Sequence, residues 1–308
     1  MTGHNYNIRN YRSDDLDECV ELWLIEGQDQ TGHFISSQII ESQLIKPDFP
    51  AQETVLVAEK DGTIIGCLNI TPEIAVKRAI INCIVHPNHR RQGVATALIN
   101  EATKQITDME ATVAATEVLE QNIAAKNLLT KLGFAAIRDF VQLQQALDTR
   151  TTEIANTELN IGHLNAGEEN ILTDLQNHAF AEHWGFSPNT TGQITHWLNQ
   201  SDSSLKHVIM AFDGDTPVGY CWTNTTPENN PATGKKHGRI HMLGVHSDYR
   251  GKGVGRTVLI AGMAFLHDRD IDIVEITADG ENKIAIGLYE SVGFEKRALS
   301  QCYERSLG

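Results

Sequence analysis

One short segment combines glycines and basic residues in an order that suits an anionic ligand. Residues 250–256 read Arg-Gly-Lys-Gly-Val-Gly-Arg, after an apolar strand pattern and before a helical one. The three glycines let the backbone curl with its N–H groups turned inward, and no Cβ blocks a close ligand. The helix that begins near Val254 adds the positive end of its dipole, and the three basic side chains add full charges. The segment therefore predicts a diphosphate-binding turn.

This turn differs from the two commonest phosphate loops. A Walker loop ends in Gly-Lys-Ser/Thr, and a Gly-x-Gly-x-x-Gly loop follows a parallel strand and precedes an acidic residue by about 20 positions. Neither pattern is present at 250–256. A helix start whose glycines serve packing alone is the structural alternative, so the pattern by itself leaves the ligand open.

A near copy of the turn occurs earlier in the chain. Solenoid repeats are about 20 to 50 residues long, so a longer repeat indicates whole domains. We therefore expect two domains of one fold, residues 1–148 and 154–308, joined by the polar stretch 148–158. Five landmarks recur at a separation of 160 positions: Arg90 and Arg250, Gly93 and Gly253, Asn122 and Asn282, Gly133 and Gly293, and Phe134 and Phe294.

Each half has the same order of expected elements. An amphipathic helix comes first (14–27 and 168–184), followed by a hairpin that turns at Asp-Gly (54–70 and 206–224). A third strand then runs into the Gly-rich turn and its helix. A further strand leads to a last helix, which in the second half Asn282 caps and Gly293 ends. We expect an α+β fold, with a mostly antiparallel mixed sheet flanked by helices in each half.

Composition narrows the class of partner. The formal charge of −15 argues against a general nucleic-acid binder, which needs a basic surface, and leaves room for a cationic substrate. No uncharged apolar run approaches 18 residues, which predicts a cytoplasmic protein without a membrane segment. The five cysteines form no Cys-x-x-Cys pair and the thirteen histidines show no metal-ligand spacing. We therefore expect neither disulfides nor a bound metal.

The two turns and the helices after them resemble the acetyl-CoA signature of the GNAT superfamily of N-acetyltransferases. The pyrophosphate loop of that superfamily, Gln/Arg-x-x-Gly-x-Gly/Ala, matches Arg250-x-x-Gly253-x-Gly255 and Arg90-x-x-Gly93-x-Ala95. The resemblance covers both halves and implies acetyl-CoA as the donor, with CoA as the product. Within the superfamily, the tandem arrangement resembles the mycothiol synthases, which acetylate a cysteinyl amine.

The resemblance also implies which residues bind acetyl-CoA. In this superfamily the strand before the loop meets the thioester and pantetheine, and the loop amides take the pyrophosphate. Asn282 is either a cofactor contact or only the cap of its helix. In the second half the implied residues are Leu243, Gly244, Val245, Arg250, Gly251, Lys252, Gly253, Val254, Gly255, Arg256 and Asn282. In the first half they are Cys83, Ile84, Val85, Arg91, Gln92, Gly93, Val94, Ala95 and Thr96.

One position distinguishes the halves. In the last helix the superfamily often places a tyrosine that protonates the departing CoA thiolate, and Tyr289 matches it, whereas the first half has Leu129. A phenol with an ordinary pKa of about 10 is protonated at neutral pH and can donate, which a leucine cannot do. The structural alternative for Tyr289 is packing beside Ala285 and Val292 on one helix face.

A general base is also required, because an amine must lose a proton before it attacks a thioester. His241 is our candidate. It lies two residues before Leu243 on the expected strand, and alternation puts both side chains on one face. A chain of water molecules is the main alternative to His241 as base. A histidine satisfied by a neighbouring carbonyl is the structural alternative.

The segment 178–188 resembles the acceptor-side helix and loop of the mycothiol synthases. His183, Trp184 and Phe186 could line an acceptor pocket, since aromatic and imidazole groups suit a small polar substrate. Ordinary packing at a helix end explains them equally well. Arg239 stands where a mycothiol synthase presents its glutamate base, and an arginine suits an acidic or phosphorylated acceptor instead.

We therefore expect an N-acetyltransferase whose second domain lets a primary amine of a small molecule attack acetyl-CoA directly. The first domain is expected to be catalytically degenerate. Acetylation of a cysteinyl amine, as by mycothiol synthase, is one alternative. A non-catalytic acyl-CoA sensor is the other, because a fold alone does not establish activity. Neither a nucleic acid nor a membrane is an expected partner, and we expect a monomer or a homodimer.

Overall fold

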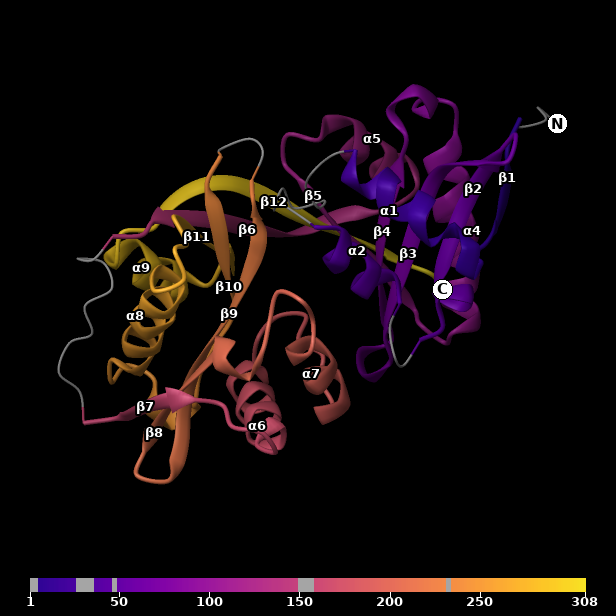
Figure 1. The fold of residues 1–308 in the computed structure, drawn as a ribbon. Coiled ribbons are helices and arrows are strands. Elements are labelled where there is room, and N and C mark those ends of the chain that lie inside the picture. The colour runs from indigo at the N-terminus through magenta and orange to yellow at the C-terminus, as the bar shows by residue number, and fades with distance from the viewer. Residues whose placement is uncertain (1–4, 26–35, 46–48, 149–157, 231–233) are drawn as a thin grey trace. The chain divides into compact units, whose positions relative to one another are not determined.

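The computed structural model describes residues 5–25, 36–45, 49–148, 158–230 and 234–308 of the 308-residue chain (Figure 1). The chain divides into two compact units. Unit 1 comprises Met1–Phe140 and Leu299–Gly308, and unit 2 comprises Val141–Ala298. Most of the expected linker, residues 149–157, lies outside the described residues. Within the described part of the chain, every helix falls short of the length and hydropathy that a membrane crossing requires.

The sheet of unit 1 has the strand order β1-β2-β3-β4-β5-β12. Only β4 and β5 pair in parallel, and the other neighbours are antiparallel. The turn between β2 and β3 uses Asp61 and Gly62, whose φ angles of 52° and 81° suit a two-residue hairpin. The strand bounds are β1 Asn7–Asn10, β2 Val55–Lys60, β3 Thr63–Glu73, β4 Arg78–Val85, β5 Val113–Leu119 and β12 Glu295–Ser306.

Hydrophobic clusters cover both faces of this sheet, because successive strand residues point to opposite sides. On β2, Leu56 packs in the cluster that contains α4, whereas Val55 and Val57 pack in the cluster that contains α1 and α2. The helix bounds are α1 Leu16–Leu24, α2 Ser37–Leu44, α3 Ala51–Thr54, α4 Val94–Asp108 and α5 Ile123–Lys131. Short 3₁₀ turns lie at η1 Ser13–Asp15, η2 Ile74–Val76 and η3 Pro87–His89.

Unit 2 repeats this plan with the strand order β6-β11-β10-β9-β8-β7. Strands β10 and β11 pair in parallel, while β7 to β10 are antiparallel neighbours. The strand bounds are β6 Ala135–Ala146, β7 Asn160–His163, β8 Val208–Asp213, β9 Thr216–Asn229, β10 Lys236–Val245 and β11 Ile273–Asp279. The helix bounds are α6 Glu169–Phe180, α7 Thr191–Leu198, η4 Leu205–His207, η5 Ser247–Tyr249, α8 Val254–His267 and α9 Lys283–Ser291.

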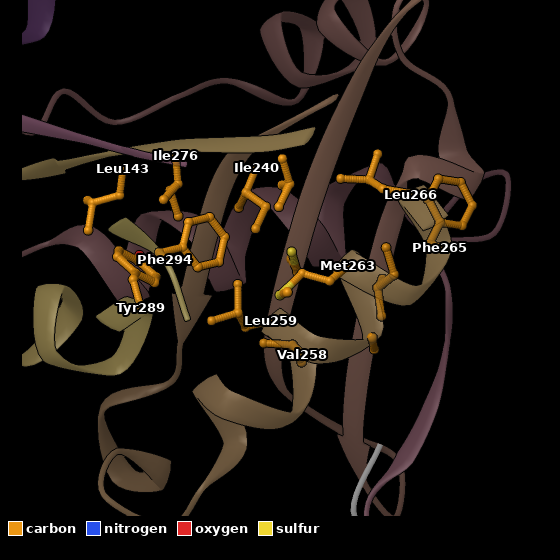
Figure 2. Packing of buried hydrophobic residues seen from close by; sticks show 14 of the residues in the cluster. Leu143, Ile240, Val258, Leu259, Met263, Phe265, Leu266, Ile276, Tyr289 and Phe294 are labelled. Carbon is orange, nitrogen blue, oxygen red and sulfur yellow. The ribbon is translucent and has the colours of Figure 1, made fainter. Parts of the chain in front are cut away.

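The larger core of unit 2 lies between α8, α9 and the sheet (Figure 2). Leu259, Met263 and Leu266 of α8 are fully buried there. Gly262 lets the helix approach β9 closely, because a Cβ at that position would lie 2.5 Å from Sγ of Cys221. A smaller cluster on the other face of the sheet contains residues of α6 and α7. The two faces of β9 and β10 therefore have different neighbours.

Each unit includes strand residues from the other half of the sequence. Tyr303 of β12 is buried in the core of unit 1, and Leu143 of β6 is buried in the core of unit 2. Within unit 1, β12 pairs with β5 from Ser300↔Leu119 to Ser306↔Val113. The chain thus passes from one unit to the other after Phe140 and again after Ala298. The architecture confirms the predicted class, an α+β fold with a mostly antiparallel sheet built twice.

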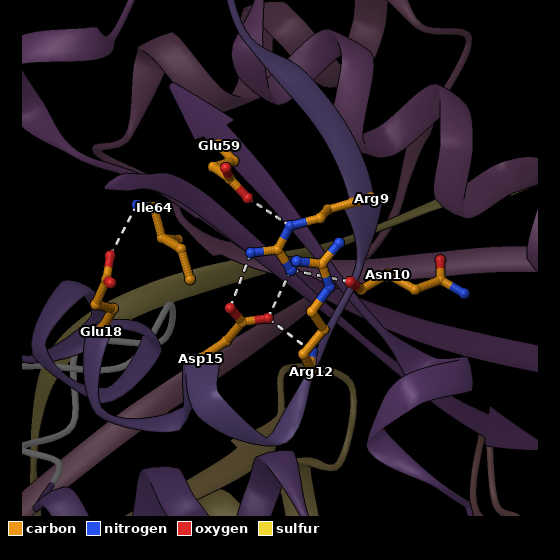
Figure 3. Close-up of polar contacts among 7 residues, drawn as sticks. All are labelled: Arg9, Asn10, Arg12, Asp15, Glu18, Glu59 and Ile64. Atoms are coloured by element: carbon orange, nitrogen blue, oxygen red, sulfur yellow. Dashed lines mark hydrogen bonds and ion pairs between the residues drawn. The ribbon is translucent and has the colours of Figure 1, made fainter. Parts of the chain in front are cut away.

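A partly buried ion-pair network fixes the first strand of unit 1 (Figure 3). The Arg9 guanidinium donates to both carboxylate oxygens of Asp15 at 2.6 and 2.8 Å, and its Nε donates to Glu59 at 2.5 Å. Asp15 is only 7% exposed and also accepts the backbone N–H of Arg12. The Arg9 hydrogen bonds lower the pKa of Asp15, although burial acts in the opposite direction. Two-point bonding of this kind holds β1 against the start of α1.

Candidate active site

The predicted anion-binding turn of unit 2 has the required backbone. Gly251 and Gly253 have φ angles of 73° and 84°, in the left-handed region that favours glycine. A Cβ at either position would meet nothing within 4 Å, so the backbone angle and not crowding explains these glycines. The hydrogen-bond ladder of α8 starts with the N–H of Thr257 bonded to the carbonyl of Gly253. The N–H groups of residues 254–256 precede that ladder and can bind an external acceptor.

The basic side chains of this turn have different neighbours. Arg256 donates to Oγ of Ser291 at 3.0 Å, and this bond links the start of α8 to the end of α9. Lys252 lies 4.9 Å above the ring of Tyr249. Arg250 donates to the carbonyl of Ala179 at 2.8 Å, and its guanidinium also lies 3.4 Å from Glu182. Arg250 therefore attaches the turn to the end of α6, whereas Lys252 and Arg256 remain exposed beside the helix start.

The parallel strands of each unit pair over a short length only. In unit 2 the pairing of β10 with β11 runs from His237↔Ile273 to Ile240↔Ile276, so residues 243–245 lie beyond the last pair. In unit 1 the pairing of β4 with β5 ends at Ile80↔Ala115, before residues 83–85. The edge of the third strand that faces its parallel neighbour therefore lacks a strand partner at the residues predicted to meet the cofactor.

A β-bulge at His241 distinguishes the third strand of unit 2 from that of unit 1. Ile240 pairs with Thr223 and Met242 pairs with Trp222, so His241 is an extra residue without its own partner on β9. The ladder between β3 and β4 runs without any shift. When residues are counted back from the last pair of each ladder, Arg239 corresponds to Ile80 of unit 1. No residue of β4 corresponds to the inserted His241.

The bulge corrects one expectation from the sequence. Simple alternation predicted that His241 and Leu243 share a face of the sheet. Leu243 instead packs with the α8 cluster, whereas the ring of His241 lies 5.4 Å from that of Trp222 and 6.3 Å from that of Trp197, on the α6 and α7 side. Because a bulge adds one residue to the strand, the side chains beyond it point to the opposite face of the sheet from the one that simple alternation predicts.

His241 can accept a proton at neutral pH. Desolvation by the surrounding protein, with a smaller contribution from the Arg239 guanidinium, lowers the pKa of His241 to about 4. The residue is nevertheless exposed, so solvent water moderates the effect. A lowered pKa keeps the imidazole neutral, and it also makes the imidazole a weaker base.

Tyr289 lies in α9 and is only 6% exposed. Its ring is 6.0 Å from that of Phe294, within the core cluster that Figure 2 shows. Burial, followed by the nearby Cys221 thiol, raises the pKa of Tyr289 above its ordinary value. The phenol is therefore protonated at neutral pH. Packing and proton donation are compatible here, because one end of a tyrosine is apolar and the other is polar.

Asparagine caps begin the last helix of both units. Asn282 accepts the N–H of Ala285 at 3.0 Å, and Asn122 accepts the N–H of Ala125 at 3.1 Å. The predicted cap is thus confirmed for Asn282, and each asparagine keeps its side-chain N–H₂ for other partners.

Unit 1 contains a cavity of about 510 Å³ between β4, β5, α4 and α5. Leu129 contributes an aliphatic wall at the position that Tyr289 has in unit 2. Gln92 differs from the other residues predicted for this site, because it does not line the cavity and its amide donates to the carbonyl of Asn88. The predicted residues that line the cavity are Cys83, Ile84, Val85, Arg91, Gly93, Val94, Ala95 and Thr96.

The segment predicted to meet the acceptor follows α6. His183, Trp184 and Phe186 are partly buried, and the rings of Phe180 and His183 are 5.5 Å apart. The end of α6 contacts the segment just before the predicted anion-binding turn, because His178 bonds Ser247 at 3.0 Å and stacks on His246. The ring contacts of His241 involve Trp197 and Trp222, neither of which belongs to the residues predicted from the sequence. Period-two spacing on β9 was the only signal for Trp222, and Trp197 had none.

The sequence matches a known protein family in both units. The profile of the Acetyltransferase (GNAT) family matches residues 13–134 and 170–294. Two similar curated proteins are the mycothiol acetyltransferases of Kocuria rhizophila and Rhodococcus erythropolis. The first is 29% identical over 259 residues, which cover 80% of this chain and 83% of the relative. The second is 26% identical over 258 residues, which cover 81% and 84%.

Solved structures share the fold across the whole chain. A GCN5-related N-acetyltransferase from Sphaerobacter thermophilus has a TM-score of 0.74 at 18% identity and covers 100% of this chain and 97% of its own. A tandem GNAT protein from the clavulanic acid biosynthesis pathway has a TM-score of 0.73 at 17% identity, with coverage of 98% and 99%. These likenesses establish the tandem arrangement of the fold.

Proposed function

Because the chain belongs to the Acetyltransferase (GNAT) family of N-acetyltransferases, we propose that its unit 2 transfers the acetyl group of acetyl-CoA to a primary amine of a small molecule. One observation carries the assignment to unit 2. Tyr289 and the inserted His241 occur only in that unit, whereas unit 1 has Leu129 and a regular strand. Groups that can donate and accept a proton are thus placed in one half of a duplicated fold.

The residues of unit 2 fit the donor. Acetyl-CoA supplies an acetyl group activated as a thioester. Its diphosphate suits the N–H groups at the start of α8, together with the exposed charges of Lys252 and Arg256. We assign the thioester end to residues 243–245, whose strand edge lies beyond the last β10–β11 pair.

Two side chains move protons in the proposed reaction. The acceptor amine attacks the thioester carbonyl directly, and neutral His241 takes its proton, either in contact or through water. Tyr289 donates its phenolic proton to the departing thiolate. The raised pKa of the phenol keeps that proton bound until the transfer. The transfer needs no covalent enzyme intermediate.

We assign a binding role without catalysis to unit 1. Its cavity is lined by the repeated turn and by the end of β4, the same elements that bind the donor in unit 2. Leu129 offers no proton to a leaving thiolate. Calorimetric titration of acetyl-CoA tests this role, with two sites expected in the native chain and one in the Gly93→Glu variant. A native chain with one site that Gly93→Glu leaves intact would contradict it.

Acetylation of a cysteinyl amine is the second candidate, because the similar curated relatives are mycothiol acetyltransferases. Arg239 disfavours this candidate, because the resemblance to the mycothiol synthases implies a glutamate base at this position and an arginine does not accept a proton. An acyl-CoA sensor is the alternative from another class. It would bind acetyl-CoA and acetylate none of a broad panel of amines.

Steady-state kinetics of Tyr289→Phe test the proposed function. We expect kcat to fall by about 100-fold while binding of acetyl-CoA is unchanged, because the variant removes a general acid and little volume. Tyr303→Phe, which removes a buried phenol from the core of unit 1, is the control and should retain activity. Full activity of Tyr289→Phe would reject Tyr289 as the proton donor.

A further inference from the structure

Three polar side chains converge beside His241, on the face of the unit 2 sheet that α6 and α7 cover. Arg239 on β10 and Asn224 on β9 are directly opposite each other in the ladder. Asn224 donates to one carboxylate oxygen of Asp202 at 2.8 Å, and Asp202 lies in the loop after α7. The neighbouring Trp222 donates to Ser203 of the same loop at 2.9 Å, which holds the loop over β9.

This cluster leaves polar atoms of both kinds without partners. Among the residues that the structure describes, Nε of Arg239 is a buried donor without an acceptor, and Oδ1 of Asp202 and Oδ1 of Asn224 are buried acceptors without donors. Asp202 is only 8% exposed, so bulk water does not replace the missing partner. An unsatisfied buried polar group costs about 1 to 3 kcal/mol, and three in one cluster indicate a place where a ligand or ordered water completes the bonding.

Structural ion pairing does not explain Arg239. Within the described part of the chain, its guanidinium forms neither a hydrogen bond nor an ion pair. Glu275 is its register partner on β11, but that carboxylate bonds His237 at 3.1 Å and Arg297 at 2.9 Å. Asp202 interacts with Arg239 only at longer range. A partly buried cation that its neighbouring carboxylates leave unpaired favours an anion from outside the protein.

Comparison with unit 1 indicates that the cluster serves unit 2 alone. The ladder positions of Arg239 and Asn224 correspond to Ile80 and Thr71, which are also directly opposite each other. An arginine is therefore not needed to build this sheet. It occurs only where the strand also carries the inserted His241.

We propose that Arg239, with Asn224 and Asp202 beside it, binds an anionic group of the acceptor, so that the substrate is a small amine that also carries a carboxylate or a phosphate. The inference rests on the proposed function of unit 2. Arg239 and His241 are two residues apart on one strand, about 7 Å along the backbone, which is the span of a small molecule. Asn224 and Asp202 offer acceptor oxygens to a donor group next to the anion. Burial raises the pKa of Asp202, and the hydrogen bond from Asn224 acts in the opposite direction.

Matched acceptors test this assignment. Phenylalanine is compared with phenylalaninamide, and glucosamine 6-phosphate with glucosamine, by kcat/KM in the native chain and in Arg239→Gln. We expect the native chain to prefer the anionic member of one pair by about 10- to 100-fold, because hydrogen bonds to charged groups are the strong ones. Arg239→Gln should remove that preference, and Arg239→Lys should restore part of it.

The pair that shows the preference identifies the anion as carboxylate or phosphate. Arg269→Gln is the control, because it removes an exposed arginine that lies over the ring of Phe265 and not in this cluster, and it should keep the preference. Equal ratios in the native chain and Arg239→Gln would overturn the inference while acetyl transfer itself stands.

If none of the amines were acetylated, the proposed function would fail and binding would still test the cluster. Calorimetric titration with each matched pair then serves as the readout. The inference requires tighter binding of one anionic member than of its neutral partner, with the difference lost in Arg239→Gln. Equal binding of both members in the native chain would overturn it.

Discussion

Leu129 and Tyr289 occupy one position in two copies of the same helix. Each follows a capping asparagine by seven residues, and its carbonyl accepts the N–H of a phenylalanine five residues later at 3.0 Å. Both side chains are buried, with 4% and 6% exposed. The backbone at the two sites is the same, so the difference in chemistry comes from a single side chain.

We propose that the duplicated fold separates binding from catalysis. Unit 1 keeps the turn, the short parallel pairing and a cavity of about 510 Å³. It lacks the phenol and the bulged histidine that we assign to proton transfer. A ligand site can persist when these groups are absent, because it depends on backbone N–H groups and apolar walls.

Acid should remove the stabilisation that Asp15 provides. We expect Asp15→Asn to lower the free energy of unfolding at pH 7 by about 2 to 3 kcal/mol, because it breaks a buried, two-point bond with Arg9. The pKa of Asp15 is lowered in the folded chain, so its contribution is complete above the unfolded pKa of about 3.9 and is lost as pH falls through the folded value. Urea unfolding at several pH values measures both effects.

Asp17→Asn is the control for this prediction, because Asp17 is exposed in α1, two residues after Asp15. It should change stability by less than about 0.5 kcal/mol. A difference between native chain and Asp15→Asn that stayed constant down to pH 2 would show that the carboxylate charge contributes nothing.

Two glycines in the helices of unit 2 should respond in opposite ways to alanine. Gly262→Ala places a Cβ 2.5 Å from Sγ of Cys221, and we expect it to destabilise the chain by about 1 to 3 kcal/mol through overpacking. Gly287→Ala meets nothing within 4 Å and should stabilise α9 by about 1 kcal/mol, because alanine has the higher helix propensity. Thermal unfolding of both variants gives the comparison.

Shortening the opposing side chain provides an internal check. In the double variant Gly262→Ala with Cys221→Ala, most of the loss from Gly262→Ala should be recovered, because the sulfur that blocks the new Cβ is gone. Additive effects of the two substitutions would show that close approach of α8 to β9 is not the cause.

The pH dependence of turnover should lack a histidine step. The lowered pKa of His241, about 4, keeps its imidazole neutral between about pH 5.5 and 7.5, where an ordinary histidine titrates. We expect kcat/KM to follow only the ionisation of the acceptor amine in that range, and His241→Gln to reduce kcat by about 100-fold. A break near about pH 6.5 that disappears in His241→Gln would contradict the lowered pKa.

Local patterns in the sequence predicted the elements that hold the site. The 160-residue repeat placed the turn, α8 and the asparagine caps correctly, because glycine angles and caps depend on neighbouring residues. The bulge at His241 was not predicted, since one inserted strand residue leaves no distinct spacing. The passage of β12 into unit 1 and the approach of Asp202 to Asn224 also depend on tertiary contacts between distant segments.

A matched pair of glycine variants tests the central claim, that unit 2 alone catalyses. Gly93 and Gly253 begin equivalent helices with the same φ of 84°, so glutamate adds similar strain and a repelling charge to either turn. The measurement is acetyl transfer to a chosen amine by Gly93→Glu and Gly253→Glu. We predict that Gly253→Glu abolishes turnover and that Gly93→Glu retains it. Loss of turnover in Gly93→Glu, or its survival in Gly253→Glu, would show that unit 2 is not the sole catalytic unit.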